Sequence, residues 1–357
     1  MRLSQLTIQN FRNIPLAELE FQGLRHFFTG ANGEGKTNLL EAIGFVTALR
    51  SFRTSERAPL IRWGESSASI RYDIDHESRK ESVVRLDLLA NRTDAQLDGE
   101  KLTRYADLVG LFPTVCFSSQ DIQLLRGTPA LRRRFIDLTF SAGDATYYQH
   151  LRRYHQTLTE RNALLKQGAA PSVLTAFEHT LADVGAPLIA LRQDGMNRLQ
   201  MTLASVYKCF CPESESPMLN YKCDLPLTSA EALHAHWQNQ RPRDLALQTT
   251  SRGPHRDDFM LNLCGRDARD AASEGQQRSL VLALRFAQAA WLEQCTGIKP
   301  ALLLDDILGE LDPPRRSAFW ASVDTGAQVF ATGTSNPTDE TGWTRWTVQH
   351  GTFARTE

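Results

Sequence analysis

One glycine-rich segment constrains this chain more than any other feature. Residues 30–37 read GANGEGKT and match the pattern G-x-x-x-x-G-K-[ST] at every specified position. A strand-like segment at 25–29 precedes it, and Leu39, Leu40 and Ile43 follow with helical spacing. A strand–loop–helix unit of this kind turns backbone N–H groups and a helix N-terminus toward a phosphate. We therefore predict a phosphate loop on an α/β sheet, in preference to an accidental glycine-rich turn.

Two residues of this loop have expected roles toward ATP and Mg²⁺. The Lys36 ammonium neutralises the β- and γ-phosphates, which makes it a catalytic candidate, and the Thr37 hydroxyl ligates Mg²⁺. The predicted nucleotide-binding residues are consecutive: Gly30, Ala31, Asn32, Gly33, Glu34, Gly35, Lys36, Thr37 and Asn38.

A second apolar strand supplies the acids that a phosphate loop needs. Residues 301–304 read ALLL and run directly into Asp305 and Asp306. We expect Asp305 to hold Mg²⁺, directly or through water, and Asp306 to orient or deprotonate the attacking water. The alternative is a buried strand that ends in two solvated aspartates, which becomes improbable beside the loop at 30–37.

A small-residue turn precedes the long helical run at 279–294. Residues 273–278 read SEGQQR, and a turn at a helix start offers N–H groups and a hydroxyl to an anion. Because the chain's own loop already carries Lys36, that anion could belong to a second subunit. A plain helix cap is the alternative.

The order of secondary-structure types along the chain predicts a domain that is split by an insertion. Residues 1–125 and 245–357 read as mixed α/β, with strands near 6–8, 19–21 and 328–332. Residues 126–244 read as mainly helical, with helices near 151–165, 177–188 and 230–240, Pro171 in a loop and a short strand near 219–223. We predict a discontinuous α/β head interrupted by a helical arm.

Charge decides where nucleic acid can bind. The chain of 357 residues carries 40 basic and 41 acidic side chains, so its net charge of −1 argues against a protein that coats nucleic acid. Between 126 and 166, however, eight basic residues face three acids, with tyrosines interleaved. We expect DNA contacts without sequence preference from Arg126, Arg132, Arg133, Arg134, Arg152, Arg153, Arg161 and Lys166. The alternative is solvated helix faces, with Arg132 and Arg133 in structural pairs beside Asp137.

Two further groups invite a chemical role that we disfavour. His255 lies in GPHRDD at 253–258, where a turn joining the arm back to the head, fixed by Pro254, is the simpler interpretation than catalysis. Scattered cysteines and histidines match neither a C-x₂-C nor an H-x₃₋₅-H spacing, which disfavours zinc at Cys209, Cys211, Cys223, His234 and His236. The same scatter, with no signal-peptide pattern at the start and no apolar run long enough to span a membrane, favours a reduced, cytoplasmic protein.

Together these motifs carry a resemblance. The order of phosphate loop, long insertion, signature turn, LLLDD and ELD resembles an ABC-type ATPase head of the SMC kind, and within that group the RecF family. Matching stretches run the whole length: NFRN at 10–13, LLEAI at 39–43, SFR at 51–53, GTP at 127–129, GPHRDD at 253–258 and SEGQQR at 273–278. An insertion of about 120 residues is too short for the extended arms of an SMC protein.

The resemblance implies a function that the residues alone do not. It implies an ATP-dependent DNA-binding protein of recombinational repair and replication that dimerises head to head around two nucleotides. Ser273, Gly275 and Gln276 of one subunit then face the γ-phosphate held by Lys36 of the other. Slow, DNA-stimulated hydrolysis acts as a release switch, and the protein helps to load recombinase at gaps and stalled forks with mediator proteins.

The sequence departs from related families at informative positions. ABC transporters place Glu after the Walker B Asp and a switch His after the next strand, whereas this chain has Asp306 and Thr332-Gly333-Thr334. The family commonly carries Pro-Glu-Asp where residues 118–121 read SSQD, and there Gln120 is a candidate Q-loop residue toward Mg²⁺ and water. The alternatives are a transporter subunit, an SMC-like repair ATPase coupled to a nuclease, and a non-catalytic DNA clamp with ATP as dimer glue.

Overall fold

The protein is described from a computed structural model that covers residues 1–54, 56–76, 81–210, 215–335 and 342–356. The chain divides into two compact units. The first comprises residues 1–121, 206–211 and 278–357, and the second comprises residues 122–205 and 212–277. These limits depart from the expected boundaries, because residues 245–277 belong to the second unit. Strand pairing explains the difference: β10 (Asp258–Leu263) pairs with β9 (Pro217–Lys222) of that same unit.

One sheet of the first unit is antiparallel and half-buried. Its strand order is β2-β1-β4-β5-β6-β7. Alternating apolar and polar residues bury one face of the long strands, as the pattern Ala68, Ile70, Tyr72, Ile74 in β4 illustrates. The strands are β1 (Arg2–Phe11), β2 (Ile14–Glu20), β4 (Ser67–Asp75), β5 (Ser82–Leu89), β6 (Thr93–Leu97) and β7 (Glu100–Lys101).

The other sheet of the first unit is mainly parallel and carries the predicted motifs. Its order is β15-β14-β3-β13-β12-β8, with only β15 antiparallel to its neighbour. The strands are β3 (Arg25–Thr29), β8 (Thr114–Ser118), β12 (Ala301–Asp305), β13 (Val329–Gly333), β14 (Thr344–Gln349) and β15 (Thr352–Thr356). Because β3, β13, β12 and β8 are parallel neighbours, their carboxyl ends meet at one edge of the sheet. That edge receives residues 30, 305 and 333 together.

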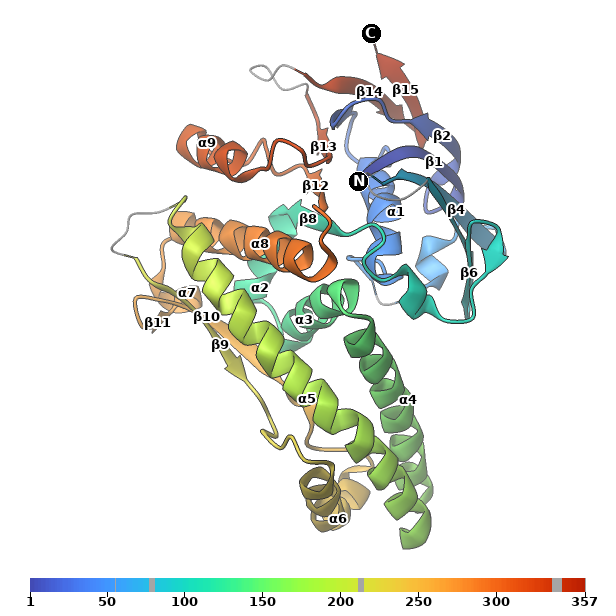
Figure 1. Cartoon of the computed structure of the whole chain (residues 1–357), viewed down its shortest axis with the longest axis vertical. Helices are drawn as coiled ribbons and strands as arrows, with labels where there is room; N and C mark the ends of the chain where they lie inside the picture. The colour runs from blue at the N-terminus through green and yellow to red at the C-terminus, as the bar shows by residue number, and fades with distance from the viewer. Residues whose placement is uncertain (55, 77–80, 211–214, 336–341, 357) are drawn as a thin grey trace. The chain divides into compact units, whose positions relative to one another are not determined.

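Helix α1 (Lys36–Ala48) fills the space beside both sheets (Figure 1). Its Leu39, Leu40 and Ile43 are completely buried and share one apolar core with side chains of β1, β4, β12 and β14. The α1 helix therefore starts at the phosphate loop and is held in place along its length by the main core. The first unit also contains α9 (Pro313–Ser322), the short 3₁₀ turns η1 (Ala58–Leu60) and η2 (Tyr105–Leu108), η3 (Ser119–Ile122) as far as Asp121, and α8 (Glu274–Thr296) from Arg278 onward.

The second unit is mainly helical with a small sheet. Figure 1 shows its long helices α4 (Ala145–Gln167) and α5 (Pro171–Tyr207) running alongside each other. The three-stranded sheet has the order β11-β10-β9, and the remaining elements are α2 (Gln123–Arg126), α3 (Pro129–Gly143), α6 (Ala230–Leu247), η4 (Pro254–Arg256), β11 (Arg266–Asp267) and α7 (Ala268–Ala271).

Two expectations for these helices were wrong. Pro171 is not in a loop; it is the first residue of α5, where its missing N–H costs nothing. The α5 helix spans 37 residues and continues through Pro187, so it is far longer than the periodic segment at 177–188 indicated. None of the helices in the described ranges combines the length and apolar character needed to cross a membrane.

Candidate functional site

The phosphate loop adopts a conformation that only glycine tolerates easily. Gly33 and Gly35 have φ angles of 86° and 115°, in the left-handed region. A Cβ atom on Gly30 would lie 2.4 Å from the carbonyl oxygen of Val348, so backbone packing also excludes a side chain there. The loop leads into α1, whose N-cap residue Gly35 provides no side-chain cap. The orphan N–H groups at this helix start are therefore available to an anion.

Lys36 and Thr37 lie where the motif places them. The Lys36 side chain is 5% exposed, and its Nζ donates to the carbonyl oxygens of Gly30 and Ala31 at 2.7 and 3.1 Å. The ammonium thus folds over the loop, beside the position of a bound phosphate. Thr37 Oγ1 donates to Asp305 Oδ1 at 2.7 Å. The two predicted metal ligands, 268 residues apart in sequence, are in direct contact.

Thr332 at the end of β13 completes this contact. Its Oγ1 lies 3.2 Å from Asp305 Oδ1 and accepts a hydrogen bond from the backbone N–H of Asp306 at 3.0 Å. Asp306 has a φ angle of 56°, an uncommon conformation for a residue with a side chain. Thr332 thus contacts the carboxylate of Asp305, the last residue of β12, and the backbone N–H of Asp306, which follows that strand.

Asp305 is held in an environment that disfavours its charge. Burial raises the pKa of Asp305, while hydrogen bonds from Thr37 and Thr332 oppose the rise and the neighbouring Asp306 carboxylate adds to it. A divalent cation bound to the Asp305 carboxylate would favour its charged form and so offset the cost of burying that charge. The hydroxyl of Thr37 and the carboxylate of Asp305 are oxygen ligands of the kind that Mg²⁺ prefers, so the residues present fit a Mg²⁺–nucleotide.

Two turns brace the loop from outside. Asn13, in the β1–β2 turn, donates from Nδ2 to Gly33 O at 3.3 Å and accepts from Asn38 Nδ2 at 2.8 Å. The β14–β15 turn donates from Gly351 N to Glu34 O at 2.8 Å, and His350 N donates to the Glu34 carboxylate. Glu34 and Asn38 thus have bonded structural partners, although both were expected among the nucleotide-binding residues.

A buried carboxylate gathers two arginines next to the loop. Glu41 on α1 is completely buried; Arg12 donates to it through Nε and Nη2 at 2.9 and 2.8 Å, and Arg53 through Nη1 at 3.1 Å. Arg53 also donates to Asn38 Oδ1 at 2.8 Å. The NFRN and SFR stretches that carried the family resemblance therefore meet here, and this cluster was not foreseen because its parts are distant in sequence.

Gln120 lies near the acids. It is exposed on η3, two residues after Ser118, which is the pairing partner of Asp305 in the parallel β8–β12 ladder. The next residue, Asp121, accepts from Ser118 N at 2.9 Å and forms an ion pair with Arg285 of α8. The turn that carries Gln120 is thus anchored through Asp121, directly after the strand that pairs with β12.

The signature turn, in the second unit, forms a capping box. Ser273 Oγ accepts from Gln276 N at 3.2 Å, and Gln276 Oε1 accepts from Ser273 N at 2.8 Å. The Gln277 amide donates to three carbonyl oxygens, of Ala268, Arg269 and Ala272. The turn around Gly275 is therefore rigid, and both the helix-cap interpretation and a role toward a second subunit's anion are compatible with it.

The basic residues of the second unit separate into exposed and structural groups. Arg126, Arg152, Arg153 and Lys166 are exposed, with Arg126 donating to Gln277 Oε1 at 2.8 Å. Arg133 and Arg134 are partly buried, and Arg133 donates to Asp257 O at 3.0 Å. Arg132 is 9% exposed and binds Asp258 through Nε and Nη2 at 2.7 and 2.9 Å. Its partner is thus Asp258, whereas Asp137 pairs with Arg192.

Arg161 is a correction to the predicted DNA contacts. Its side chain is completely buried between Glu178 at 2.9 Å and Asp244 at 2.8 Å, and it donates to Thr250 Oγ1 as well. A guanidinium enclosed by two carboxylates cannot reach a DNA phosphate. Arg161 and Arg132 were counted as surface cations because α4 and α3 read as amphipathic, but their partners come from distant segments.

The GPHRDD stretch also serves packing. His255 Nδ1 lies 2.8 Å from the Tyr154 hydroxyl and Nε2 lies 2.9 Å from Thr250 O, and burial lowers the pKa of His255 to about 4. Asp257 is completely buried and accepts from Arg192 Nη1 at 2.7 Å. The residues form a polar core inside the second unit, so this turn does not join the two units as we expected.

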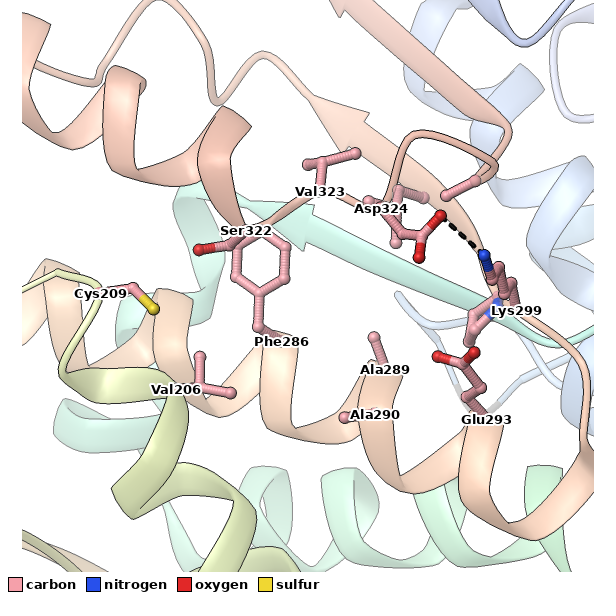
Figure 2. Close-up of a pocket in the computed structure, with 13 residues that line it drawn as sticks. Val206, Cys209, Phe286, Ala289, Ala290, Glu293, Lys299, Ser322, Val323 and Asp324 are labelled. Atoms are coloured by element: carbon pink, nitrogen blue, oxygen red, sulfur yellow. Dashed lines mark hydrogen bonds and ion pairs between the residues drawn. The ribbon is translucent and has the colours of Figure 1, made fainter.

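A separate cavity of about 230 Å³ opens in the first unit. Figure 2 shows Phe286 and Ala289 of α8 beneath Val323, with the Lys299–Asp324 ion pair at one side. Leu302 at the start of β12 lines it, whereas Asp305 ends the same strand, about 10 Å further along. The cavity is therefore not the nucleotide site.

No group of three or more potential metal ligands of the His, Cys, Asp and Glu types occurs in the described ranges, and Cys211 of the disfavoured zinc set lies outside them.

Comparison with known proteins assigns the family. The family model "RecF/RecN/SMC N terminal domain" matches residues 2–348. DNA replication and repair protein RecF of Heliobacterium modesticaldum is 34% identical over 94% of this chain and 92% of its own length. The corresponding protein of Symbiobacterium thermophilum is 36% identical over the same shares. The chain belongs to the RecF family.

Solved structures support the same assignment and the fold. A structure of the recombination mediator protein RecF-ATP in the RecFOR pathway is 30% identical, has a TM-score of 0.90, and covers 99% of this chain and 97% of that one. An Smc head bound to the C-winged helix domain of ScpA is 15% identical with a TM-score of 0.52 over 100% of this chain and 98% of that one, which bears on the fold alone. The predicted ABC-type ATPase head with an inserted, mainly helical lobe is therefore confirmed.

Proposed function

We propose that this protein is an ATP-dependent DNA-binding protein of DNA replication and recombinational repair. The observation that carries the proposal is the direct contact between Thr37 and Asp305 beside Lys36 in a chain of the RecF family. ATP with Mg²⁺ is the proposed ligand. The relatives are named for DNA replication and repair, and a similar structure is described as RecF-ATP, which supports both parts of the proposal.

The proposed cycle uses residues already described. Lys36 leaves the carbonyl oxygens of Gly30 and Ala31 to neutralise the β- and γ-phosphates, and the backbone N–H groups at the start of α1 bind phosphate oxygens. Thr37 and Asp305 would hold Mg²⁺, which when bound would neutralise phosphate charge as a Lewis acid, and Gln120 is a further candidate ligand. Asp306 orients or deprotonates the attacking water.

ATP binding is proposed to join two heads on DNA. Ser273, Gly275 and Gln276 of one subunit then face the γ-phosphate held by the other, and slow, DNA-stimulated hydrolysis releases the dimer. DNA contacts come from the exposed cations Arg126, Arg152, Arg153 and Lys166, without sequence preference. We place the protein in the cytoplasm, where it helps recombination mediator proteins load recombinase at gaps and stalled forks.

Sizing in solution tests this cycle. We expect a monomer-to-dimer shift that requires ATP and is enhanced by DNA, loss of the shift in Lys36→Met, and a persistent ATP-bound dimer on DNA in Asp306→Asn. Loss of a general base typically lowers the turnover about 10²–10⁴-fold. The matched control is Asp324→Asn, which changes an exposed carboxylate between α9 and β13 that binds Lys299.

The same experiment separates the rival functions. If Asp306→Asn turns over ATP at the wild-type rate, the catalytic assignment is wrong and a clamp with ATP as dimer glue is favoured. A Lys36→Met variant that still dimerises with ATP would contradict the nucleotide site itself. Nuclease activity copurifying with the dimer would favour the SMC-like nuclease partner.

A further inference from the structure

One tryptophan of the first unit is presented to solvent almost completely. Trp63 is 99% exposed, whereas Trp237, Trp291 and Trp346 are at most 6% exposed. Exposing a whole indole forgoes about 2 kcal/mol or more of burial free energy, so a ring in this position suggests a ligand that covers it.

The backbone that carries Trp63 is fixed. Glu65 N donates to Arg62 O at 3.0 Å and Gly64 has a φ of 89°, which defines a tight turn with Trp63 at its tip. Arg62 N donates to Asn10 O at 2.8 Å, and Ile61 pairs with Phe11 in an antiparallel bridge. The turn is therefore docked on the end of β1, and the ring is displayed without a loop having to become ordered.

This turn belongs to a basic segment. Between residues 50 and 65 there are four arginines and two glutamates: Arg50, Arg53, Arg57, Arg62, Glu56 and Glu65. All four arginines are exposed in whole or in part, and Arg53 is 43% exposed while it binds Glu41. Since Lys36 and the loop already serve the phosphates of one nucleotide, these additional cations match a ligand with further phosphates.

We infer that Trp63 is a stacking platform for a base of single-stranded DNA, with the neighbouring arginines contacting its backbone. An aromatic ring beside a positive surface is the arrangement by which proteins hold single strands without sequence preference. A pocket for a single nucleotide base would enclose the base on several sides, whereas Trp63 offers an open ring. The inference rests on the proposed function, because it adds a DNA contact on the first unit to those proposed on the second.

The test compares base-bearing and abasic DNA. The full-length protein is titrated with an oligodeoxythymidine of about 16 nucleotides and with an abasic strand of equal length, at one salt concentration. Trp63→Ala is expected to weaken binding of the oligodeoxythymidine about fivefold or more and to leave the abasic strand unaffected. Trp63→Phe is expected to restore most of the loss, and Leu16→Ala, another exposed apolar side chain of this unit at 55% exposure, is the matched control.

Each other outcome overturns the inference. Equal weakening on both strands would mean that Trp63 does not act by stacking on bases. Weakened ATP binding with normal DNA binding would assign the ring to the nucleotide, and loss of the ATP-dependent dimer alone would assign it to a second copy of the chain. A wild-type protein that binds no DNA would refute the proposed function itself, whereas normal DNA binding by Trp63→Ala would refute only the role of Trp63.

Discussion

At the scale of single residues, the candidate site contains a carboxylate whose charge is unfavourable in its surroundings. Asp305 is partly buried next to a second carboxylate, and its charge is offset by the hydroxyl groups of Thr37 and Thr332 and by the more distant Arg53. Sites that bind charged ligands commonly carry such a penalty, because the groups are arranged for the ligand and not for the empty fold. Asp306, with its left-handed backbone, is a second residue whose conformation is explained by function more readily than by stability.

Asp305→Asn is expected to stabilise the nucleotide-free protein. Because the folded-state pKa is raised, protonation of Asp305 stabilises the fold below the ordinary carboxyl pKa, and that contribution is lost as pH rises through the folded-state pKa. At pH 7.5 the neutral amide therefore raises Tm, while it weakens Mg²⁺–ATP binding.

Thermal unfolding without nucleotide checks this prediction. Asp324→Asn is the control and is expected to lower Tm slightly, because the hydrogen bond from Lys299 lowers the pKa of Asp324 and so favours its charged form in the folded protein. A Tm of Asp305→Asn at or below that of the wild type would contradict the prediction that the charge of Asp305 destabilises the nucleotide-free fold.

At the scale of secondary-structure elements, the second unit is held together by buried charge as well as apolar packing. Arg161 joins α4 to α5 through Glu178 and to α6 through Asp244. Arg192 of α5 binds both Asp137 of α3 and Asp257 next to β10. These arginines fix which faces of the helices meet, since a shift of one turn would leave a carboxylate buried without a partner.

Arg161→Met is expected to destabilise the protein by about 3–5 kcal/mol, because Asp244 is left buried without its cation. Arg161→Lys is expected to lose less stability, because lysine keeps the positive charge. It still loses some, because lysine lacks the planar guanidinium that bonds two carboxylates and a hydroxyl together. Arg152→Met, on the exposed face of the same helix, is the control with little effect. Urea unfolding measures all three, and an Arg161→Met variant as stable as the Arg152→Met control would refute the structural role.

His255 makes the same region sensitive to acid. With its pKa lowered to about 4, neutral His255 stabilises the fold above its ordinary pKa of about 6.5, and this stability is lost as pH falls from about 6.5 toward 4. His255→Gln keeps an acceptor for Tyr154 and a donor for Thr250 without a titrating group.

Hydrogen exchange of α4 and α6 is the measurement for this prediction. Amides of the wild type are expected to lose protection between pH 7 and 5, corrected for intrinsic exchange, and those of His255→Gln to lose less. An equal loss in both proteins would attribute the acid sensitivity to other groups, of which buried His26, in the first unit, is one.

At the scale of the whole molecule, a net charge of −1 is compatible with DNA binding because charge is unevenly distributed. Three carboxylates of the second unit, those of Glu178, Asp244 and Asp257, are buried against arginines and add no negative charge to its surface. Arg152, Arg153 and Lys166 of α4, by contrast, are exposed where a polyanion can reach them. Overall charge therefore says little about the surface until the internal ion pairs are subtracted.

Arg152→Glu with Arg153→Glu is expected to weaken DNA binding and to flatten its dependence on salt. Each lost phosphate contact lowers the slope of log K against log salt by about 0.7 on single strands or 0.9 on duplex DNA. Arg161 is left intact, so the fold is expected to be retained. Fluorescence anisotropy at several salt concentrations checks this, and an unchanged slope would move the DNA contacts away from α4.

The sequence by itself determined the phosphate loop, the pair of acids at the end of β12, the family and the fold class, because these are local patterns. GANGEGKT fixes a backbone conformation within eight residues, and an apolar run followed by Asp305 and Asp306 identifies the end of a buried strand. Only the tertiary structure decided which side chains are partners. Thr332 beside Asp305, the Arg12–Glu41–Arg53 cluster and the burial of Arg161 each depend on contacts between segments far apart in the chain. Helical spacing shows which face of a helix a side chain occupies, but not whether another element brings a carboxylate to that face. The presence of such a carboxylate decides whether an arginine is buried in a structural ion pair or can reach DNA.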